Sequence, residues 1–179
     1  AVQADQVLRL GDWEAPEPTD FAIRDNAIET VTRSATGAGP GGLPVWRVTV
    51  ECDRIETVQE DLAGNVDNAR RARLAKQTRR VVASDETVRE RHPLAGDITI
   101  NSVLASYAQS QAVADRVLQL LSVRRDSVQV EALEAVLPTV GGNLTLITPR
   151  QGYGNGRAMR VTGYRLNAQT DELSLNLWG

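Results

Sequence analysis

Four short segments with alternating apolar residues lie between residue 127 and the last residue of this 179-residue chain, and they constrain its fold more than any other feature. Such alternation gives a β-strand one face for the core and one for solvent. The segments are SVQVEAL (127–133), NLTLITP (143–149), RAMRVTGYRL (157–166) and ELSLNLWG (172–179). They predict an antiparallel sheet or a small barrel, in which LSLNLWG is the closing strand and pairs with RAMRVTGYRL.

One amphipathic helix is predicted over about 107–121. Ser106 followed by Gln109 has the spacing of a capping box, and apolar residues then recur at helical intervals. Ala108 and Ala112 keep the same side small, so we expect the helix to lie close against the sheet. In this arrangement three helix residues (Val113, Val117 and Leu120) cover three strand residues (Leu173, Leu175 and Leu177), and Trp178 falls on the opposite face of its strand.

The first half of the chain predicts further strands and short helices. AIETVT (27–32) and VWRVTVEC (45–52) read as strands joined by the glycine-rich loop TGAGPGGLP (36–44). In the second strand, one face carries Trp46, Val48, Val50 and Cys52. A helical turn over 57–64, a helix from about Val66, a short helix over 86–93 and a strand over 97–104 follow.

The predicted fold class is therefore α+β, mainly an antiparallel β sheet or small barrel with one well-defined helix and short helical segments. We expect an N-terminal segment with its Gly/Pro-rich loop over 1–44 and a β-rich domain over 45–179. One continuous domain that includes the N-terminal strands is the alternative.

Composition limits the function. The chain carries 20 Lys and Arg against 23 Asp and Glu, a net charge of −3, which gives no general attraction to nucleic acid or anionic membranes. No apolar run approaches the roughly 20 residues of a membrane-spanning helix, so we expect no membrane span. The start of the chain has no signal-peptide features. It also lacks an initiator Met, which indicates either processing or a fragment of a longer protein, and we expect the fragment.

Few groups suit catalysis. His92 is the only histidine and precedes Pro93 in a charged turn, so we expect it on the surface and not in a hydrolase triad. Cys52, the only cysteine, falls on the inward face of its strand, where a buried, unreactive thiol is expected. One histidine and one cysteine cannot build a four-ligand zinc site. We expect no enzyme activity and no metal site.

Two glycine-rich stretches, TGAGPGG (36–42) and GYGNG (152–156), have the composition of phosphate-binding loops. Such a loop needs the N–H groups of a following helix, and the second stretch leads into a strand pattern, so we expect no cofactor. Paired carboxylates stay open as an alternative site, either among Glu56, Glu60 and Asp61 or between Glu131 and Glu134.

A basic run is the strongest candidate for an interaction site. It comprises Arg70, Arg71, Arg73, Lys76, Arg79 and Arg80, with Arg89 and Arg91 close behind. Phosphates bind such patches, but no aromatic residues are interleaved for base stacking, and acidic residues flank the run. We expect a solvated or subunit-facing surface and no specific nucleic-acid binding.

The motifs of the C-terminal half, in order, resemble one group of proteins. An alanine-rich helix precedes Arg-Arg-Asp (124–126), a Thr-Pro-Arg-x-Gly-Tyr turn (148–153), Gly-Arg (156–157) leading to Val-Thr-Gly (161–163), and LSLNLWG (173–179). Over residues 85–179 this order is similar to the tail-tip or baseplate hub proteins of tailed bacteriophages and phage-like particles. VWRVTVECDRIETVQEDLAG (45–64) is a weaker similarity to the same proteins.

The resemblance implies a structural component of the virion tail, assembled in the host cytoplasm, that connects the tail tube to fibres or to a puncturing device. It implies other tail-tip or baseplate proteins as partners and a homo-oligomer, for which a trimer is the expected form. Candidate subunit-interface residues are Trp178, Arg70, Arg71 and Arg73. A tail-associated cell-wall hydrolase and a carbohydrate- or nucleic-acid-binding module are the alternatives.

Overall fold

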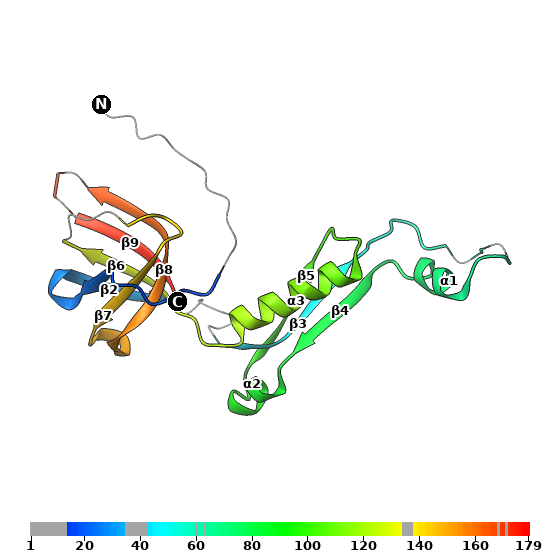
Figure 1. Ribbon diagram of the computed structural model, residues 1–179, viewed down its shortest axis with the longest axis horizontal. Helices are drawn as coiled ribbons and strands as arrows, with labels where there is room; N and C mark the ends of the chain where they lie inside the picture. The colour runs from blue at the N-terminus through cyan, green and yellow to red at the C-terminus, as the bar shows by residue number, and fades with distance from the viewer. Residues whose placement is uncertain are drawn as a thin grey trace. The chain divides into compact units, whose positions relative to one another are not determined.

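The computed structural model describes residues 14–34, 43–59, 61–62, 64–133, 138–167, 169–170 and 172–179, which form two compact units (Figure 1). Unit 1 combines the residues up to Ser34 with Ser127–Gly179, and unit 2 lies between them in the sequence. This division differs from the expected boundary between residues 44 and 45. The reason is that the strand before the glycine-rich loop pairs with a strand beyond residue 126.

Unit 1 is built on a six-stranded sheet with the order β1-β7-β8-β9-β6-β2. Its strands are β1 (Ala22–Arg24), β2 (Ile28–Ser34), β6 (Ser127–Ala132), β7 (Asn143–Thr148), β8 (Tyr153–Asn167) and β9 (Glu172–Trp178). All neighbours are antiparallel except β1 and β7, which run parallel. The four predicted C-terminal strands are confirmed. Among the described residues the sheet is open, with β1 and β2 at its ends, so the small-barrel alternative is wrong.

Strand β9 pairs on both sides. Leu175 lies opposite Tyr164 of β8 and opposite Val130 of β6. The predicted pairing with RAMRVTGYRL is confirmed. β9 is last in the described chain but lies in the interior of the sheet, because β6 and β2 continue the sheet beyond it.

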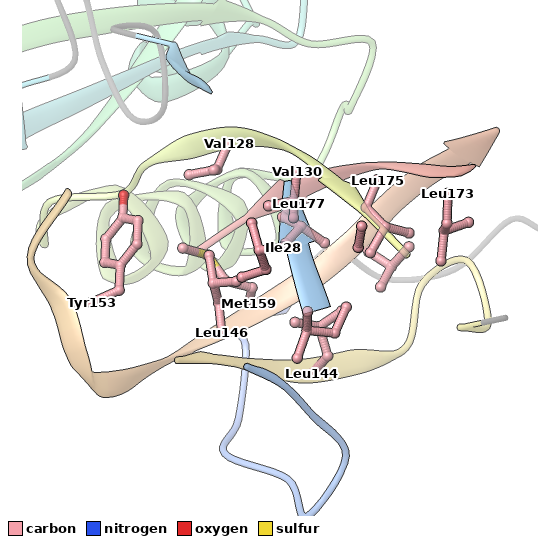
Figure 2. Close-up of a cluster of buried hydrophobic side chains, with 13 residues drawn as sticks. Ile28, Val128, Val130, Leu144, Leu146, Tyr153, Met159, Leu173, Leu175 and Leu177 are labelled. Atoms are coloured by element: carbon pink, nitrogen blue, oxygen red, sulfur yellow. The ribbon is translucent and has the colours of Figure 1, made fainter. Parts of the chain in front are cut away.

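The core of unit 1 consists of side chains from the strands of its own sheet (Figure 2). Leu173, Leu175 and Leu177 are each at most 1% exposed and belong to this core. The expectation that the long helix covers these leucines is wrong. Val113 and Val117 of that helix pack in a separate core, in unit 2.

Unit 2 contains a three-stranded sheet with the order β4-β3-β5, and a helix covers one face (Figure 1). Its strands are β3 (Val45–Cys52), β4 (Arg79–Ser84) and β5 (Gly96–Asn101), and its helices are α1 (Asn68–Leu74), α2 (Glu86–Arg91) and α3 (Tyr107–Leu121). β3 is antiparallel to β4 but parallel to β5, so this sheet is mixed. No helix occurs in the described part of 57–64; Glu60 and Ala63 lie outside the described residues.

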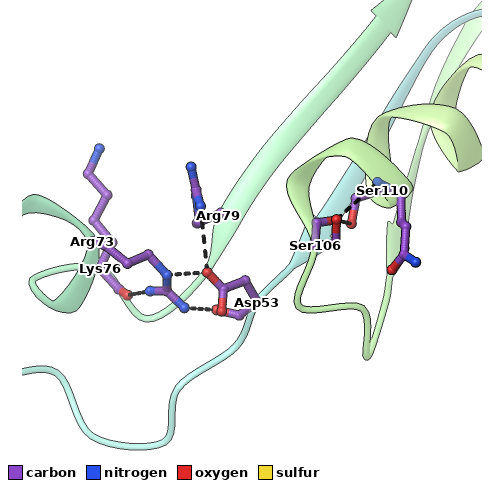
Figure 3. Close-up of polar contacts among 7 residues, drawn as sticks. Asp53, Arg73, Lys76, Arg79, Ser106 and Ser110 are labelled. Carbon is purple, nitrogen blue, oxygen red and sulfur yellow. Dashed lines mark hydrogen bonds and ion pairs between the residues drawn. The ribbon is translucent and has the colours of Figure 1, made fainter. Parts of the chain in front are cut away.

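Helix α3 has the predicted bounds. The Ser106 hydroxyl caps it by accepting a hydrogen bond from the backbone N–H of Gln109. Its close approach to the sheet depends on Ser110 and Ala114, both fully buried, and the Ser110 hydroxyl donates to the Ser106 carbonyl (Figure 3). Ala108 and Ala112, which were expected there, are exposed. Ala108 and Ala112 are each two positions from Ser110, and two positions along a helix correspond to a rotation of about 200° around its axis. The two alanines therefore lie on the side of the helix opposite Ser110.

Strand β3 has an irregular start that changes which residue faces the core. The pairing with β5 shifts between Val45 and Arg47, and Val45 is fully buried whereas Trp46 is partly exposed. The Trp46 ring instead contacts the guanidinium groups of Arg47 and Arg89, at 4.7 and 4.8 Å from its centroid. The predicted inward face is correct for Val48, Val50 and Cys52 and wrong for Trp46, because the irregularity precedes Val48.

Candidate functional site

The candidate interface residues belong to different units. Trp178 ends β9 in unit 1 and is 5% exposed, so most of its surface is already covered within the chain. Arg70 and Arg71 are exposed on α1 in unit 2. Arg73, on the same helix, turns toward the sheet and its side chain is only 16% exposed. The structure therefore gives these residues three different environments.

Arg73 is held by Asp53, the residue that follows β3 (Figure 3). The Arg73 Nε–H donates to the Asp53 carboxylate, one terminal N–H group donates to the Asp53 carbonyl, and the other donates to the Lys76 carbonyl at 2.8 Å. Arg79 approaches the same carboxylate at 3.8 Å. Two donor groups of this guanidinium thus tie α1 to the end of β3, and the third holds the turn that follows α1.

Asp53 also connects the end of β3 to the segment that precedes α3. Its backbone N–H donates to the Leu104 carbonyl at 2.7 Å, and its φ of 50° lies in the left-handed region that non-glycine residues rarely adopt. The hydrogen bond from Arg73, together with the charges of Arg73 and Arg79, lowers the pKa of the Asp53 carboxyl against the opposing effect of burial. Asp53 therefore carries a negative charge at neutral pH. Sequence reasoning missed it because its partners are 20 and more residues away.

A hollow lies beside this ion-pair cluster, between α1, the start of β4 and the start of α3. We call it the cationic hollow; it is lined by Ala69, Ala72, Arg73, Lys76, Thr78, Arg79, Arg80 and Tyr107. The structure brings four of the six predicted basic residues to its wall. The Tyr107 ring, half exposed, lies 5.2 Å from the Arg79 guanidinium. Arg80 pairs with Glu51 of β3 at 2.8 Å.

A second, polar hollow lies on the sheet of unit 1. It is lined by Glu29, Gln129, Glu131, Arg165, Asn167, Glu172 and Ser174. Glu131 accepts a hydrogen bond of 2.5 Å from the Thr30 hydroxyl, and Gln129 donates to the Ser174 hydroxyl. Of the predicted carboxylate pairs, Glu131 is found here with Glu29 and Glu172, whereas Glu60 and Glu134 lie outside the described residues. Sequence spacing did not reveal this grouping, because it joins three strands.

The two candidate catalytic residues, His92 and Cys52, differ in their exposure to solvent. His92 is exposed and ends α2, as expected of a surface histidine. Cys52 is fully buried, which confirms the prediction of a buried thiol. Within the described ranges, no three His, Cys, Asp or Glu residues are grouped closely enough to hold a metal ion. No helix in those ranges has the length and apolar character needed to cross a membrane.

The Thr-Pro-Arg-x-Gly-Tyr motif forms a second ion-pair cluster, in unit 1. The buried Thr148 hydroxyl donates to Asp25 at 2.5 Å and accepts from the Arg150 backbone N–H, and the Arg150 side chain lies 3.2 Å from the same carboxylate. Arg150 also donates to the Glu29 carbonyl. The short 3-10 helix η3 (Arg150–Gly152) leads directly into β8, so no helix follows the GYGNG stretch. The motif therefore fastens β7 to the link between β1 and β2.

No protein-family model matches the chain, and no curated protein matches its sequence. Among solved structures, a chain of the virion of a native gene transfer agent particle matches 92% of this chain with 14% identity and a TM-score of 0.50. A prophage tail protein from Listeria monocytogenes (9% identity, TM-score 0.47) and a tail protein from Neisseria meningitidis (15% identity, TM-score 0.45) match 92% and 93% of it.

The matches cover only part of those proteins. The chain spans 32% of the length of the gene transfer agent chain, and 43% and 45% of the two tail proteins. At this level of identity the likeness concerns the fold. The chain thus shares its fold with part of a protein from a gene transfer agent particle.

Proposed function

We propose that this chain is a structural component of the tail of a phage or phage-like particle, in its hub or tip, where it connects the tail tube to fibres or to a puncturing device. The observation that supports the proposal is the fold shared with the gene transfer agent chain over 92% of this chain. The order of motifs in the C-terminal half, which resembles that of tail-tip or baseplate hub proteins, also supports it, and within that order the Thr148–Arg150 motif fastens β7.

The proposal includes self-association and contact with other tail proteins. Both sheets end in strands with one unpaired edge among the described residues, and sheet edges in proteins are usually paired or covered. A ring of identical subunits, a trimer in the expected case, would cover such edges. Arg70, Arg71 and Trp178 remain candidate interface residues. Because Trp178 is only 5% exposed, we expect it to contribute more to the stability of its own sheet than to a contact with another subunit.

The experiment is purification of particles from the source strain, followed by detection of the full-length protein by mass spectrometry and cross-linking. We expect the protein in assembled particles, cross-linked to other tail proteins and to copies of itself. Its absence from intact particles, or a strictly monomeric full-length protein both in solution and in particles, contradicts the proposal.

A tail-associated cell-wall hydrolase is the competing function, and the polar hollow of unit 1 is where its carboxylates would lie. The test is release of soluble fragments from purified peptidoglycan by wild type and by Glu131→Gln. We expect no release by either protein. Turnover by the wild type that Glu131→Gln abolishes would replace the structural proposal with an enzymatic one.

A further inference from the structure

We infer that the cationic hollow of unit 2 binds an acidic segment of another protein in the tail, an inference that rests on the proposed function. The hollow takes carboxylate side chains of an extended peptide. Its recognition groups are Lys76, Arg79 and the hydroxyl groups of Thr78 and Tyr107, all of which line it.

The charge of this region departs sharply from that of the chain. Residues 68–84 contain six of the 20 Lys and Arg residues and none of the 23 Asp and Glu residues, although the whole chain has a net charge of −3. A concentrated positive patch on an otherwise acidic protein is a feature that steers and orients a negatively charged partner.

The cations of the hollow differ in how far they are already neutralised. The charge of Arg73 is neutralised by its ion pair with Asp53, and Arg80 forms an ion pair with Glu51. Arg79 is 3.8 Å from the Asp53 carboxylate and 43% exposed, so it keeps donors for a ligand. The Lys76 side chain is exposed and has no hydrogen-bond or ion-pair partner among the described residues.

The hollow is also preorganised. Two contacts of Arg73 with Asp53 fix α1 against the end of β3, and its third contact, to the Lys76 carbonyl, fixes the backbone of Lys76 in the turn after α1. The Arg79 guanidinium lies over the Tyr107 ring, 5.2 Å from its centroid. A site whose charged groups are held in place before binding loses less conformational entropy when a ligand arrives.

A peptide fits this site better than nucleic acid does. Nucleic-acid grooves follow the phosphate backbone with continuous positive charge and stack bases on exposed aromatic rings. Here Asp53 and Glu51 interrupt the positive surface, and the one aromatic ring of the hollow, Tyr107, already has Arg79 beside it. Two available cations beside hydroxyl groups suit a short run of carboxylates.

The experiment titrates a fluorescent oligo-glutamate peptide into the chain, with oligo-glutamine of equal length as the uncharged probe. Variants are Lys76→Glu, the double variant Lys76→Glu/Arg79→Glu, the charge-conserving Lys76→Arg, and Arg91→Glu. The last reverses an exposed charge on α2, outside the hollow. Circular dichroism checks the folding of each variant, and Lys76→Glu alone serves if the double variant fails to fold.

We expect oligo-glutamate to bind and oligo-glutamine not to bind. Lys76→Glu should weaken binding about tenfold and the double variant more, whereas Lys76→Arg and Arg91→Glu should bind as wild type. Equal losses for Arg91→Glu and Lys76→Glu, or no oligo-glutamate binding, overturn the inference. Tighter binding of duplex DNA, lost in the same variants, also overturns it. Detection of the wild-type protein in particles is independent of these titrations, so it separates failure of this inference from failure of the proposed function.

Discussion

Arg157 of β8 donates a hydrogen bond of 3.0 Å to the carbonyl oxygen of Gly179, the residue after β9. Two motifs that are separate in the sequence, Gly-Arg at 156–157 and LSLNLWG at 173–179, therefore meet in unit 1. Gly179 is buried and sits against β8 so closely that a side chain has no space. A Cβ there would lie 2.3 Å from the Ala158 carbonyl oxygen and 2.8 Å from the Met159 sulfur.

Gly179→Ala should therefore destabilise unit 1, because the added methyl group forces residue 179 away from β8 and weakens the hydrogen bond from Arg157. We expect a loss of about 1–3 kcal/mol, measured by chemical denaturation. Gly64→Ala is the matched control, because a Cβ at residue 64 meets no atom within 4 Å. Equal stability of the two variants would show that Gly179 is not held against β8.

Leu175→Ala should cost about 2–5 kcal/mol, since Leu175 is fully buried in an interior strand of the six-stranded sheet. Leu166→Ala, at a position of β8 that is 43% exposed, should cost much less. Thermal melting followed by near-ultraviolet circular dichroism measures both. A Leu175→Ala variant that melts like wild type would mean that β9 does not contribute to the core.

Thr148→Val should destabilise unit 1 by about 1–3 kcal/mol, because the buried hydroxyl bonds Asp25 and the Arg150 backbone and valine satisfies neither. Thr99→Val, on an exposed position of β5, is the control. Urea denaturation compares the two. If the Thr99 variant loses as much stability, the hydroxyl bonds of Thr148 make no special contribution.

The Asp53–Arg73 pair should make unit 2 sensitive to acid. The folded-state pKa of Asp53 is lowered, chiefly by the hydrogen bond from Arg73. Its contribution to stability is therefore fully present above the unfolded-state pKa, about 3.9, and disappears as the pH falls through the lower folded-state pKa. The melting temperatures of wild type and Asp53→Asn should differ at about pH 7, and the difference should be smaller at about pH 2.5, below the unfolded-state pKa. Glu90→Gln, at an exposed position of α2, should show no such decrease. A gap that is the same at both pH values for Asp53→Asn contradicts this role.

The strands of unit 1 and the bounds of α3 could be predicted from the sequence because their signals are local. Alternation over a few residues determines which side of β9 is apolar, and Ser106 with Gln109 marks the start of α3 whatever the helix packs against. The buried Cys52 follows from the same alternation in β3.

The tertiary structure decided which elements belong together. β2 pairs with β6 across about 100 residues, and α3 packs on β3 and β4 in the core of unit 2, whereas the leucines of β9 belong to the core of unit 1. The sequence does not show which sheet an apolar helix face will pack against, because hydrophobic burial is non-directional and any apolar sheet face can cover it. The irregular start of β3, which turns Trp46 out of the core, is likewise absent from any alternating pattern.

The candidate sites divide in the same way. The basic run is visible in the sequence as a density of charge, but the difference between Arg73, bound to Asp53, and Lys76, available in the hollow, exists only in the fold. The acid that neutralises Arg73 lies 20 residues before it in the sequence, and Asp25 lies 123 residues before Thr148. Composition thus determined where positive charge is abundant, and tertiary contacts decided which charges are satisfied, because an ion pair depends on distance in space and not on separation along the chain.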